Sequence, residues 1–379
     1  MSMSIHQDVM RAHIRVFNLR NLVRIDRVML LLILALALVG VLTLMSANRS
    51  FSGVNAYYMK QMVFFGLGAV ACAMIACIDH RFLVSLAPLL YAGSIGLLVA
   101  VLIVGAEIKG GQRWLSIGPF GGQPSEPAKL ALILMLTWYL TAIGPKIRKI
   151  PYVLLTFIIA AIPGLLILRE PNLGTAAILG PIVFAMLYVA GCKRWHLIAI
   201  LLAGLAATPV AWTQLKDYQQ TRVMTFINPA SDPQGSGYHT IQSMITVGSG
   251  GLTGKGYMEG TQTYLSYLPE HHTDFIFSLL AEEWGLVGAC GVIVIFALFL
   301  TRALSYAHNS IDLSGSLLVT GIVSLLAFHV FVNIAITLGM MPVTGIPLPF
   351  LSYGGSFYLT TMMSVGVLFS VNARRGIFD

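Results

Sequence analysis

Charged residues and cysteines are both scarce in this chain. Lysine, arginine, aspartate and glutamate make up 10% of its 379 residues, whereas hydrophobic residues make up 57%. So little charge cannot cover a water-soluble globule, and several apolar runs of about 18 residues or more are long enough to cross a bilayer. The four cysteines, Cys72, Cys77, Cys192 and Cys290, lie in or beside those runs, so no disulfide framework is indicated. The sequence predicts an all-α polytopic membrane protein.

Acidic residues are fewer than basic ones, and the basic residues are unevenly placed. The chain has 15 Asp and Glu against 23 Lys and Arg, a net charge of +8. We predict ten transmembrane helices, at about 28–46, 60–78, 83–105, 127–144, 151–168, 173–190, 196–213, 274–301, 314–338 and 355–372. The segments on the side of the termini hold Arg11, Arg15, Arg20, Arg24, Arg27, Arg81, Lys146, Arg148, Lys149, Lys193, Arg194, Arg302, Arg374 and Arg375. The positive-inside rule therefore places both termini in the cytoplasm, and the net charge gives no reason to invoke nucleic acid.

Two parts are predicted along the chain. Residues 1–27 alternate arginine with apolar residues at helical spacing, which is typical of a basic amphipathic segment on the anionic inner leaflet. Residues 28–379 form a single membrane domain with a long extracytoplasmic loop at 214–273. No cleavable signal peptide is predicted, because the first apolar run is a full span without a small-residue cleavage site after it.

The long polar loop ends at Asp274, immediately before a further apolar run. Ser278 and Glu282 follow at four and eight residues, so on a helix the three lie on one face at or just below the membrane surface. A charge in the bilayer costs roughly 2.5–3.5 kcal/mol by insertion scales and persists mainly where it lines a cavity. A functional site is therefore the first interpretation of Asp274, with Glu282 beside it.

A glycine-rich loop at 105–126 combines a cation, an aromatic ring and a pair of opposite charges. Trp114 is either an interfacial anchor or, next to Arg113, part of a site that holds a sugar by stacking and an anionic amphiphile by charge. Glu126 and Lys129 lie three residues apart in the first turn of the fourth span, where two prolines suit the helix start. They are either a self-neutralising pair at the interface or part of a binding site.

Two segments interrupt apolar runs without the composition of a water-exposed loop. Residues 169–175 form a short break, and residues 341–355 carry three prolines yet are mostly apolar, so no helix can continue through them. Non-helical backbone at membrane depth must be buried in protein or line a watery cavity. The second segment is therefore predicted to be re-entrant, before the tenth span.

A glycine-rich tract at 248–256 includes Lys255. It lacks the spacing of a nucleotide-binding loop and faces away from cytoplasmic ATP. One interpretation is a series of tight turns, and the other is a cradle of backbone N–H groups that receives a pyrophosphate beside Lys255. His271 and His272 have no third ligand at metal spacing, so the zinc signal is weak.

Together the motifs GGQRW, QPSEPAK, GYHTIQSMITVGSGGLTGKG, LPEHHTDFIFSLLAEEWG and MPVTGIPLPFLSYGGS resemble the shape, elongation, division and sporulation family, and its elongation branch most closely. The motifs occur in family order over about residues 28 to 375. The resemblance implies a ten-helix peptidoglycan glycosyltransferase of the bacterial inner membrane that polymerises lipid II, a disaccharide-peptide on undecaprenyl pyrophosphate, on the extracytoplasmic side during cell elongation. It also implies a class B penicillin-binding protein as the crosslinking partner within an elongation complex.

The resemblance assigns roles to individual positions. The essential catalytic aspartate of the HTDFIF motif falls on Asp274, the QRW motif on Arg113 and Trp114, and the acid and base of QPSE-x-AK on Glu126 and Lys129. The chain departs from the family at EPNLGT, where QPDLGT is usual. Asn172 replaces an acid there and cannot serve as a base, and Glu170 replaces a glutamine. Pro127, in place of a bulky apolar residue, is expected to move only the helix start.

The chemistry of such a substrate needs one base and several cations. A pyrophosphate leaving group is already a weak base, so a second carboxyl group, as in glycoside hydrolases, is not required. We expect Asp274 to act as the general base toward the acceptor hydroxyl. The candidates to bind the substrate are Lys60, Arg113, Trp114, Glu126, Lys129, Arg222, Lys255 and Glu282. A divalent cation, Mg²⁺ or Mn²⁺, could share the pyrophosphate, although the sequence has no dedicated site for one.

Three alternatives remain open from the residues alone. A flippase or transporter for lipid-linked sugars also needs polar groups in spans, but it predicts important charges near the midplane, whereas here they gather at one face. A scaffold for wall enzymes does not require Asp274 at a costly site. The division-type homologue of the same family is the third alternative.

Overall fold

The structure is a bundle of long helices with a small sheet at one end. The computed structural model describes residues 17–48, 57–108, 111–117, 120–214, 217–229, 236–264 and 272–374. The helices of the bundle are α3 (Arg27–Ala47), α4 (Tyr57–Cys77), α6 (Ala87–Val104), α7 (Ser125–Ile143), α8 (Ile150–Arg169), α9 (Leu173–Val189), α10 (Arg194–Gln214), α14 (Ile276–His308), α15 (Leu313–Thr337) and α16 (Gly355–Asn372). Shorter helices are α2 (Arg20–Val23), α5 (His80–Ser85), the 3-10 helix η2 (Gly144–Arg148), α11 (Asp217–Ile227), α12 (Ser236–Ser249) and α13 (Thr261–Tyr264).

Seven helices of the described part are long and apolar enough to cross a membrane. They are Arg27–Ala47, Tyr57–Cys77, Ala87–Val104, Ser125–Arg148, Ile150–Arg169, Ile276–His308 and Leu313–Thr337. Two shorter apolar helices, Leu173–Val189 and Arg194–Pro209, lie between them in the chain. The prediction of a helical polytopic membrane protein is therefore confirmed.

One prediction about the polar connections was wrong, and a second connection holds more secondary structure than its polarity indicates. The strands β1 (Ala106–Ile108), β2 (Gly111–Ile117) and β3 (Phe120–Gly122) form an antiparallel sheet in order β1-β2-β3, so the chain is not all-α. The long loop at 214–273 contains α11, α12 and α13. The glycines of the first loop and the mixed polarity of the second gave no clear periodicity, and packing against the bundle decides their structure instead.

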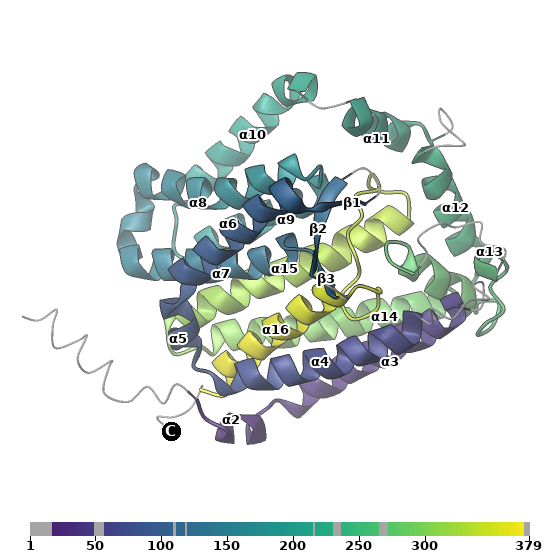
Figure 1. Cartoon of the computed structure of the whole chain (residues 1–379), viewed down its shortest axis with the longest axis horizontal. Helices are drawn as coiled ribbons and strands as arrows, with labels where there is room; N and C mark the ends of the chain where they lie inside the picture. The colour runs from purple at the N-terminus through teal and green to yellow at the C-terminus, as the bar shows by residue number, and fades with distance from the viewer. Residues whose placement is uncertain are drawn as a thin grey trace, which may run out of the picture.

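The bundle is built around α15. It packs against α14, α9, α7 and α16, while α16 lies along α4 and α3 lies beside α14 (Figure 1). In contrast, α10 leaves the bundle at its edge and contacts chiefly α9 (Figure 1). Its exposed apolar side chains include Leu201, Leu202 and Leu205. From there the chain passes through α11 and α12 along the outside and returns to the bundle at α14 (Figure 1).

Short polar residues cap the helices where each begins. Asp26 accepts hydrogen bonds from the N–H groups of Val28 and Met29 at 3.0 and 3.3 Å, and Asp312 accepts one from Gly315 at 3.1 Å. Such caps satisfy N–H groups that have no partner within the helix.

Charged residues tie the helix ends together at the end of the bundle that carries α2 and α5. Arg302 Nε lies 2.7 Å from Asp26, and Arg81 Nε lies 2.8 Å from Asp312, which also contacts His80 at 3.3 Å. Burial opposes ionisation of Asp312, but the hydrogen bonds and charges of His80 and Arg81 outweigh it and hold the pKa of this carboxyl below its usual value. The opposite end, with the sheet and the prolines of 341–354, is where the candidate site lies.

Of the predicted amphipathic segment 1–27, residues 1–16 lie outside the described residues. In the remainder only Arg20–Val23 is helical before α3 begins at Arg27.

Candidate active site

Asp274 lies in a turn whose backbone is fixed by three consecutive contacts. The carbonyl of His272 accepts from the Tyr353 N–H at 3.0 Å, that of Thr273 from Ser352 Oγ at 2.6 Å, and that of Asp274 from Asn333 Nδ2 at 2.9 Å. The side chain of Asp274 is half-buried. A Cβ built on Gly345 would lie 3.5 Å from Asp274 Oδ2, so the carboxylate lies beside the proline-rich segment 341–354.

The predicted stripe of Asp274, Ser278 and Glu282 is divided in the structure. Helix α14 begins only at Ile276, so Asp274 precedes it. Ser278 Oγ lies 2.8 Å from Ser243 on α12, and Glu282 binds the loop after α12. Each of the three residues therefore faces a different element, and Asp274 alone lies in the turn next to the segment 341–354.

The segment 341–354 has no helix and packs into the protein, as its prolines predicted. Ile346, Leu348, Phe350 and Leu351 are all at most 2% exposed. Its polar backbone is bonded by side chains, including Asn333 Nδ2 to the carbonyl of Ile346 at 2.7 Å. Such bonds are what non-helical backbone requires inside a membrane protein.

Aromatic rings lie directly beside the turn of Asp274. Tyr57, at the start of α4, stacks on His272 with ring centroids 4.3 Å apart and an interplanar angle of 16°, and it meets Tyr353 edge-on at 5.0 Å. All three side chains are half-buried. Burial, and then the neighbouring Tyr57, raise the pKa of Tyr353, so its hydroxyl stays a hydrogen-bond donor. Stacked rings next to a carboxylate suit a sugar ring with hydroxyl groups at its edge.

Glu126 and Lys129 form the predicted ion pair, and the structure adds a third member. Lys129 Nζ lies 2.9 Å from Glu126 and 3.0 Å from His329 Nε2, and it lies 5.7 Å from the ring centre of Phe357. Lys129 is 1% exposed and Glu126 4%. The ammonium is thus enclosed by protein in this arrangement.

The glycine-rich tract 248–256 is bonded to α14 through its backbone. It docks on α14 at Gly285, whose φ of 65° and ψ of −166° interrupt the helix. The N–H groups of Lys255 and Gly256 donate to the carbonyls of Glu282 and Glu283 at 3.0 Å, so they are not available to a pyrophosphate.

Helix α14 in turn donates hydrogen bonds to the tract. The N–H groups of Leu286 and Val287 donate to the carbonyls of Gly251 and Leu252 at 3.0 and 3.1 Å. A Cβ at Gly254 would overlap the carbonyl oxygen of Glu283, which explains the glycine there. The tract therefore replaces the helical hydrogen bonds that the break at Gly285 removes.

The side chain of Lys255 completes the docking. Its Nζ lies 2.7 Å from Glu282, which is fully buried and also accepts from the N–H of Gln262 at 2.9 Å. The neighbouring Glu283 bonds Ser46 on α3. These two acids therefore hold the loop and α3 against the first turns of α14.

Arg113 on β2 binds the break between α8 and α9. Its Nε donates to the carbonyl of Glu170 at 2.9 Å, and its Nη2 donates to that of Pro171 at 2.6 Å. Asn172 caps α9 by accepting from the Thr175 N–H at 3.2 Å, a role that asparagine and aspartate fill equally well. Asn172 therefore serves as the N-cap of α9.

Glu170 is fully buried beside this arginine. Neither carboxyl oxygen has a hydrogen-bond partner, and burial raises the pKa of Glu170 to about 8 although Arg113 opposes the shift. Burial therefore favours the protonated, neutral form of this carboxyl, at the position where the family resemblance leads us to expect a neutral glutamine.

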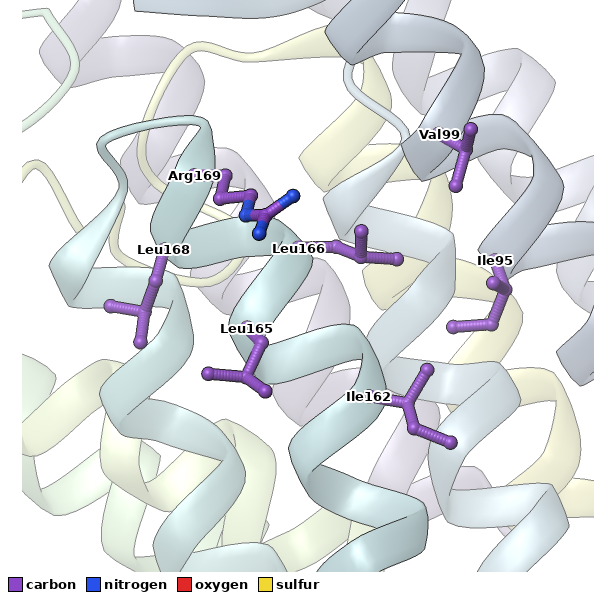
Figure 2. Close-up of a pocket in the computed structure, with 7 residues that line it drawn as sticks. All are labelled: Ile95, Val99, Ile162, Leu165, Leu166, Leu168 and Arg169. Atoms are coloured by element: carbon purple, nitrogen blue, oxygen red, sulfur yellow. The ribbon is translucent and has the colours of Figure 1, made fainter.

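An apolar groove opens beside this region on the outside of the bundle. Ile95 and Val99 of α6 and Ile162, Leu165, Leu166 and Leu168 of α8 line it, with Arg169 at one end (Figure 2). Its volume is about 590 Å³. The apolar walls match a lipid chain, and the guanidinium matches an anionic head group.

The remaining predicted substrate-binding residues have less defined surroundings. Lys60 is exposed on α4, one turn after Tyr57, while Trp114 on β2 and Arg222 on α11 are half-buried. Sequence reasoning also overlooked Tyr57, His329, Asn333 and Ser352, although the placing of His329 and Asn333 four residues apart in a spanning run was a usable signal.

The bundle belongs to the class of polytopic helical membrane proteins. Its end with the small sheet carries a carboxylate beside aromatic rings, and an apolar groove lies between α6 and α8. Residues 23–376 match the model of the FtsW, RodA and SpoVE family of cell cycle proteins, and the chain belongs to this family.

Relatives and solved structures agree with that assignment. The chain is 40% identical to the peptidoglycan glycosyltransferase MrdB of Escherichia coli K12 over 356 residues, which cover 93% of this chain and 95% of that protein. A solved chain of a peptidoglycan synthase complex that coordinates polymerization and crosslinking has a TM-score of 0.81 and 34% identity, covering 93% of this chain and 98% of that one. The rod shape determining protein RodA of Thermus thermophilus has a TM-score of 0.70 and 32% identity, covering 93% and 97%.

Proposed function

We propose that this chain is a peptidoglycan glycosyltransferase that polymerises lipid II into β-1,4-linked glycan strands during cell elongation, with Asp274 as the general base. The family and the glycosyltransferase named among its relatives support the activity. The observation that carries the role of Asp274 is its half-buried carboxylate on a turn with three fixed carbonyls, beside aromatic rings. A base must be held in place at the reacting atoms, and such a turn provides this.

In the proposed reaction Asp274 takes the proton of the acceptor GlcNAc 4-hydroxyl as that oxygen attacks the anomeric carbon of the donor MurNAc. The new C–O bond forms as the bond to the pyrophosphate breaks, and the α-linked donor becomes a β-1,4 linkage by inversion. The proton stays on Asp274 until water removes it, and the lipid pyrophosphate leaves with the electron pair. One carboxylate suffices because the leaving group does not need protonation.

The pyrophosphate needs cations, and the candidate residues differ in their surroundings. Lys129 and Lys255 are paired with the buried acids Glu126 and Glu282. Lys60, Arg113 and Arg222 are exposed or half-buried, and Arg113 binds the backbone carbonyls of Glu170 and Pro171. We propose the three exposed or half-buried cations as direct contacts, and Lys129 as a contact only after the pair with Glu126 rearranges. The groove that ends at Arg169 supports a substrate that carries a long apolar chain (Figure 2).

We propose that a divalent cation, if the reaction uses one, binds chiefly through the substrate. Within the described residues no group of three or more His, Cys, Asp or Glu side chains could hold a metal ion. A Mg²⁺ or Mn²⁺ ion would therefore be held by the pyrophosphate oxygens together with Asp274, and it would supply charge neutralisation there.

We also propose the finer topology of the chain. Ten crossings, with α9, α10 and α16 added to the seven long helices, place both termini in the cytoplasm of a bacterium and the end with β1–β3 outside the inner membrane. The many basic residues on the side of the termini support this orientation. Residues 341–354 are then re-entrant, the membrane domain covers 28–379, and 1–27 lies on the inner leaflet.

The alternatives are less well supported. A flippase predicts its important charges near the midplane, whereas Asp274, Lys255 and Arg113 gather at one end of the bundle. The branch for cell elongation is favoured over the division branch because MrdB is 40% identical, compared with 37% for an FtsW of Trichlorobacter lovleyi.

A polymerisation assay with the purified chain and lipid II tests the assignment of the base. Asp274→Asn keeps the size of the side chain and removes the base, so the rate should fall on the order of 10²–10⁴-fold while the protein stays folded in detergent. Glu259→Gln, at an exposed acid of the same polar loop, is the matched control and should keep the wild-type rate. Glycan synthesis by Asp274→Asn near the wild-type rate would remove Asp274 from the mechanism.

We further propose that the chain works with a class B penicillin-binding protein in an elongation complex. The similarity to a chain of a complex that joins polymerization to crosslinking supports this partner. Contact through the spans could shift the loop that ends at Asp274 between resting and active arrangements. Co-purification with the partner should raise the rate per molecule. An isolated chain that is fully active, and that the partner neither binds nor accelerates, would contradict the coupling but leave the glycosyltransferase assignment intact.

A further inference from the structure

Two buried polar residues of α15 contact the parts of the molecule that carry Asp274 and Lys129. His329 and Asn333 lie four residues apart, so they occupy the same face of α15 one turn from each other. They are 1% and 0% exposed. Burying a polar side chain inside a spanning helix costs free energy unless the side chain is hydrogen-bonded. The hydrogen-bond partners of these two residues therefore indicate their role.

Asn333 joins the turn of Asp274 to the segment 341–354. Its Nδ2 donates to the carbonyl of Asp274 at 2.9 Å and to that of Ile346 at 2.7 Å. Both amide hydrogens are used by these two acceptors, and the flipped amide would put its oxygen against two carbonyls. The orientation of the side chain is therefore fixed, and so is the distance between the two backbone segments.

His329 joins Lys129 to the next residue of the same segment. Its Nδ1 lies 3.1 Å from the carbonyl oxygen of Pro347, which can only accept, so Nδ1 carries the hydrogen. Its Nε2 lies 3.0 Å from Lys129 Nζ, which donates while also bonding Glu126 at 2.9 Å. The imidazole therefore bridges the ion pair and the proline-rich segment as a neutral ring.

Asn333 and His329 bond the carbonyls of two consecutive residues. Ile346 and Pro347 are consecutive, and residue 345 is the glycine beside the carboxylate of Asp274, 3.5 Å from a built Cβ. One face of α15 thus sets where Asp274 lies relative to Lys129, through three successive residues of the segment 341–354.

We propose that His329 and Asn333 are positioning residues for the reaction, which fix the carboxylate of Asp274 relative to the cation of Lys129. This inference rests on the proposed function of Asp274 as the base. Misplacement of a reacting group by about 1 Å can cost on the order of 100-fold in rate, so loosening either contact should lower kcat more than it changes KM.

The test compares variants that remove the bonds with one that preserves them. His329→Leu and Asn333→Leu remove both bonds of each residue and should lower kcat about tenfold to a hundredfold, with KM for lipid II within about twofold. His329→Gln keeps one donor and one acceptor and should restore most of kcat. Thr320→Val is the matched control, since Thr320 Oγ1 donates only within α15, to the carbonyl of Ser316 at 2.8 Å.

Two further measurements separate positioning from a general loss of structure. Thermal unfolding in detergent gives the folded fraction of each variant, and kcat is corrected for it. The acid limb of the pH profile of kcat should move in Asn333→Leu, because the surroundings of the Asp274 carboxylate change. In the Asp274→Asn background, Asn333→Leu should lower the residual rate by less than twofold, because the residue acts through Asp274.

The outcomes distinguish this inference from the proposed function. If Asp274→Asn is inactive but both leucine variants of α15 keep the wild-type kcat and pH profile, the positioning role is wrong and the base assignment stands. If His329→Gln is as slow as His329→Leu while equally folded, the bonding role of His329 is wrong. If Asp274→Asn is itself active, the proposed function fails first.

Discussion

Replacing Glu170 by glutamine should stabilise this protein, and more so at high pH than at low pH. Glu170 is fully buried, and both of its carboxyl oxygens lack a hydrogen-bond partner. Burial raises the pKa of Glu170 from its ordinary 4.5 to about 8, against the opposing charge of Arg113. Glutamine is also the residue expected at this position from the family motif. An amide has no proton to gain or lose in this pH range. Glutamine therefore removes the pH-dependent part of the free-energy cost of burying the carboxyl.

The magnitude follows from the difference between the two pKa values. The folded state favours the protonated carboxyl of Glu170. The contribution of this carboxyl to the stability of the protein is therefore complete below pH 4.5, and it is lost as the pH rises toward 8. One pKa unit corresponds to about 1.4 kcal/mol. At pH 7 the free energy of unfolding is therefore about 3 kcal/mol lower than it would be with a side chain that stays neutral. At pH 5.5 it is lower by about 1.4 kcal/mol. The difference levels off about one pH unit above the folded-state pKa.

The assay is thermal unfolding of the purified protein in detergent between pH 5.5 and 8. The difference in Tm between Glu170→Gln and the wild type should widen by roughly a few degrees over this range. Glu259→Gln is the control, because it removes an exposed charge that water already stabilises, and its effect on Tm should be the same throughout. A difference for Glu170→Gln that does not change with pH would mean that the carboxyl is already ionised in the folded protein, and the reasoning would be refuted.

Two other predictions concern the loop and the ion pair. Gly254→Ala should lower Tm and slow polymerisation, because the added methyl overlaps the carbonyl of Glu283 at a φ of +82°, whereas Gly248→Ala in the same tract meets nothing within 4 Å and should change neither. Glu126→Gln and Lys129→Met should each lose about 3–5 kcal/mol by leaving one buried charge unpaired, and the double variant should recover stability but not activity. Recovery of both in unfolding and polymerisation assays would make the pair structural only.

The sequence was sufficient for the helical membrane bundle and for several elements of the site. The apolar runs predict the long helices, and the prolines predict both the start of α7 and the absence of helix at 341–354. The spacing of Glu126 and Lys129 predicts their ion pair, which the structure confirms at 2.9 Å. In each case the signal is local, because it depends on residues within one or two helical turns.

What the sequence could not predict depends on contacts between distant segments. The hydrogen bonds between the tract 248–256 and α14 depend on a break at Gly285 that composition does not reveal. The partners of Asn333 lie 59 and 13 residues away in the chain. Similarly, the sequence marks Arg113 only as a candidate substrate contact. In the structure its guanidinium donates to the carbonyls of residues 170 and 171.

The break at Gly285 also bears on how the chain enters the membrane during its synthesis. Residues 286–308 of α14 span roughly 35 Å, which exceeds the hydrocarbon core of about 30 Å without the turns before the break. From Gly285 to Thr301 the sequence has no charged residue, whereas Glu282 and Glu283 lie just before it. The insertion machinery therefore meets an uninterrupted apolar segment. We expect the acidic turns and Asp274 to stay outside the apolar segment, so that they impose little penalty on its insertion.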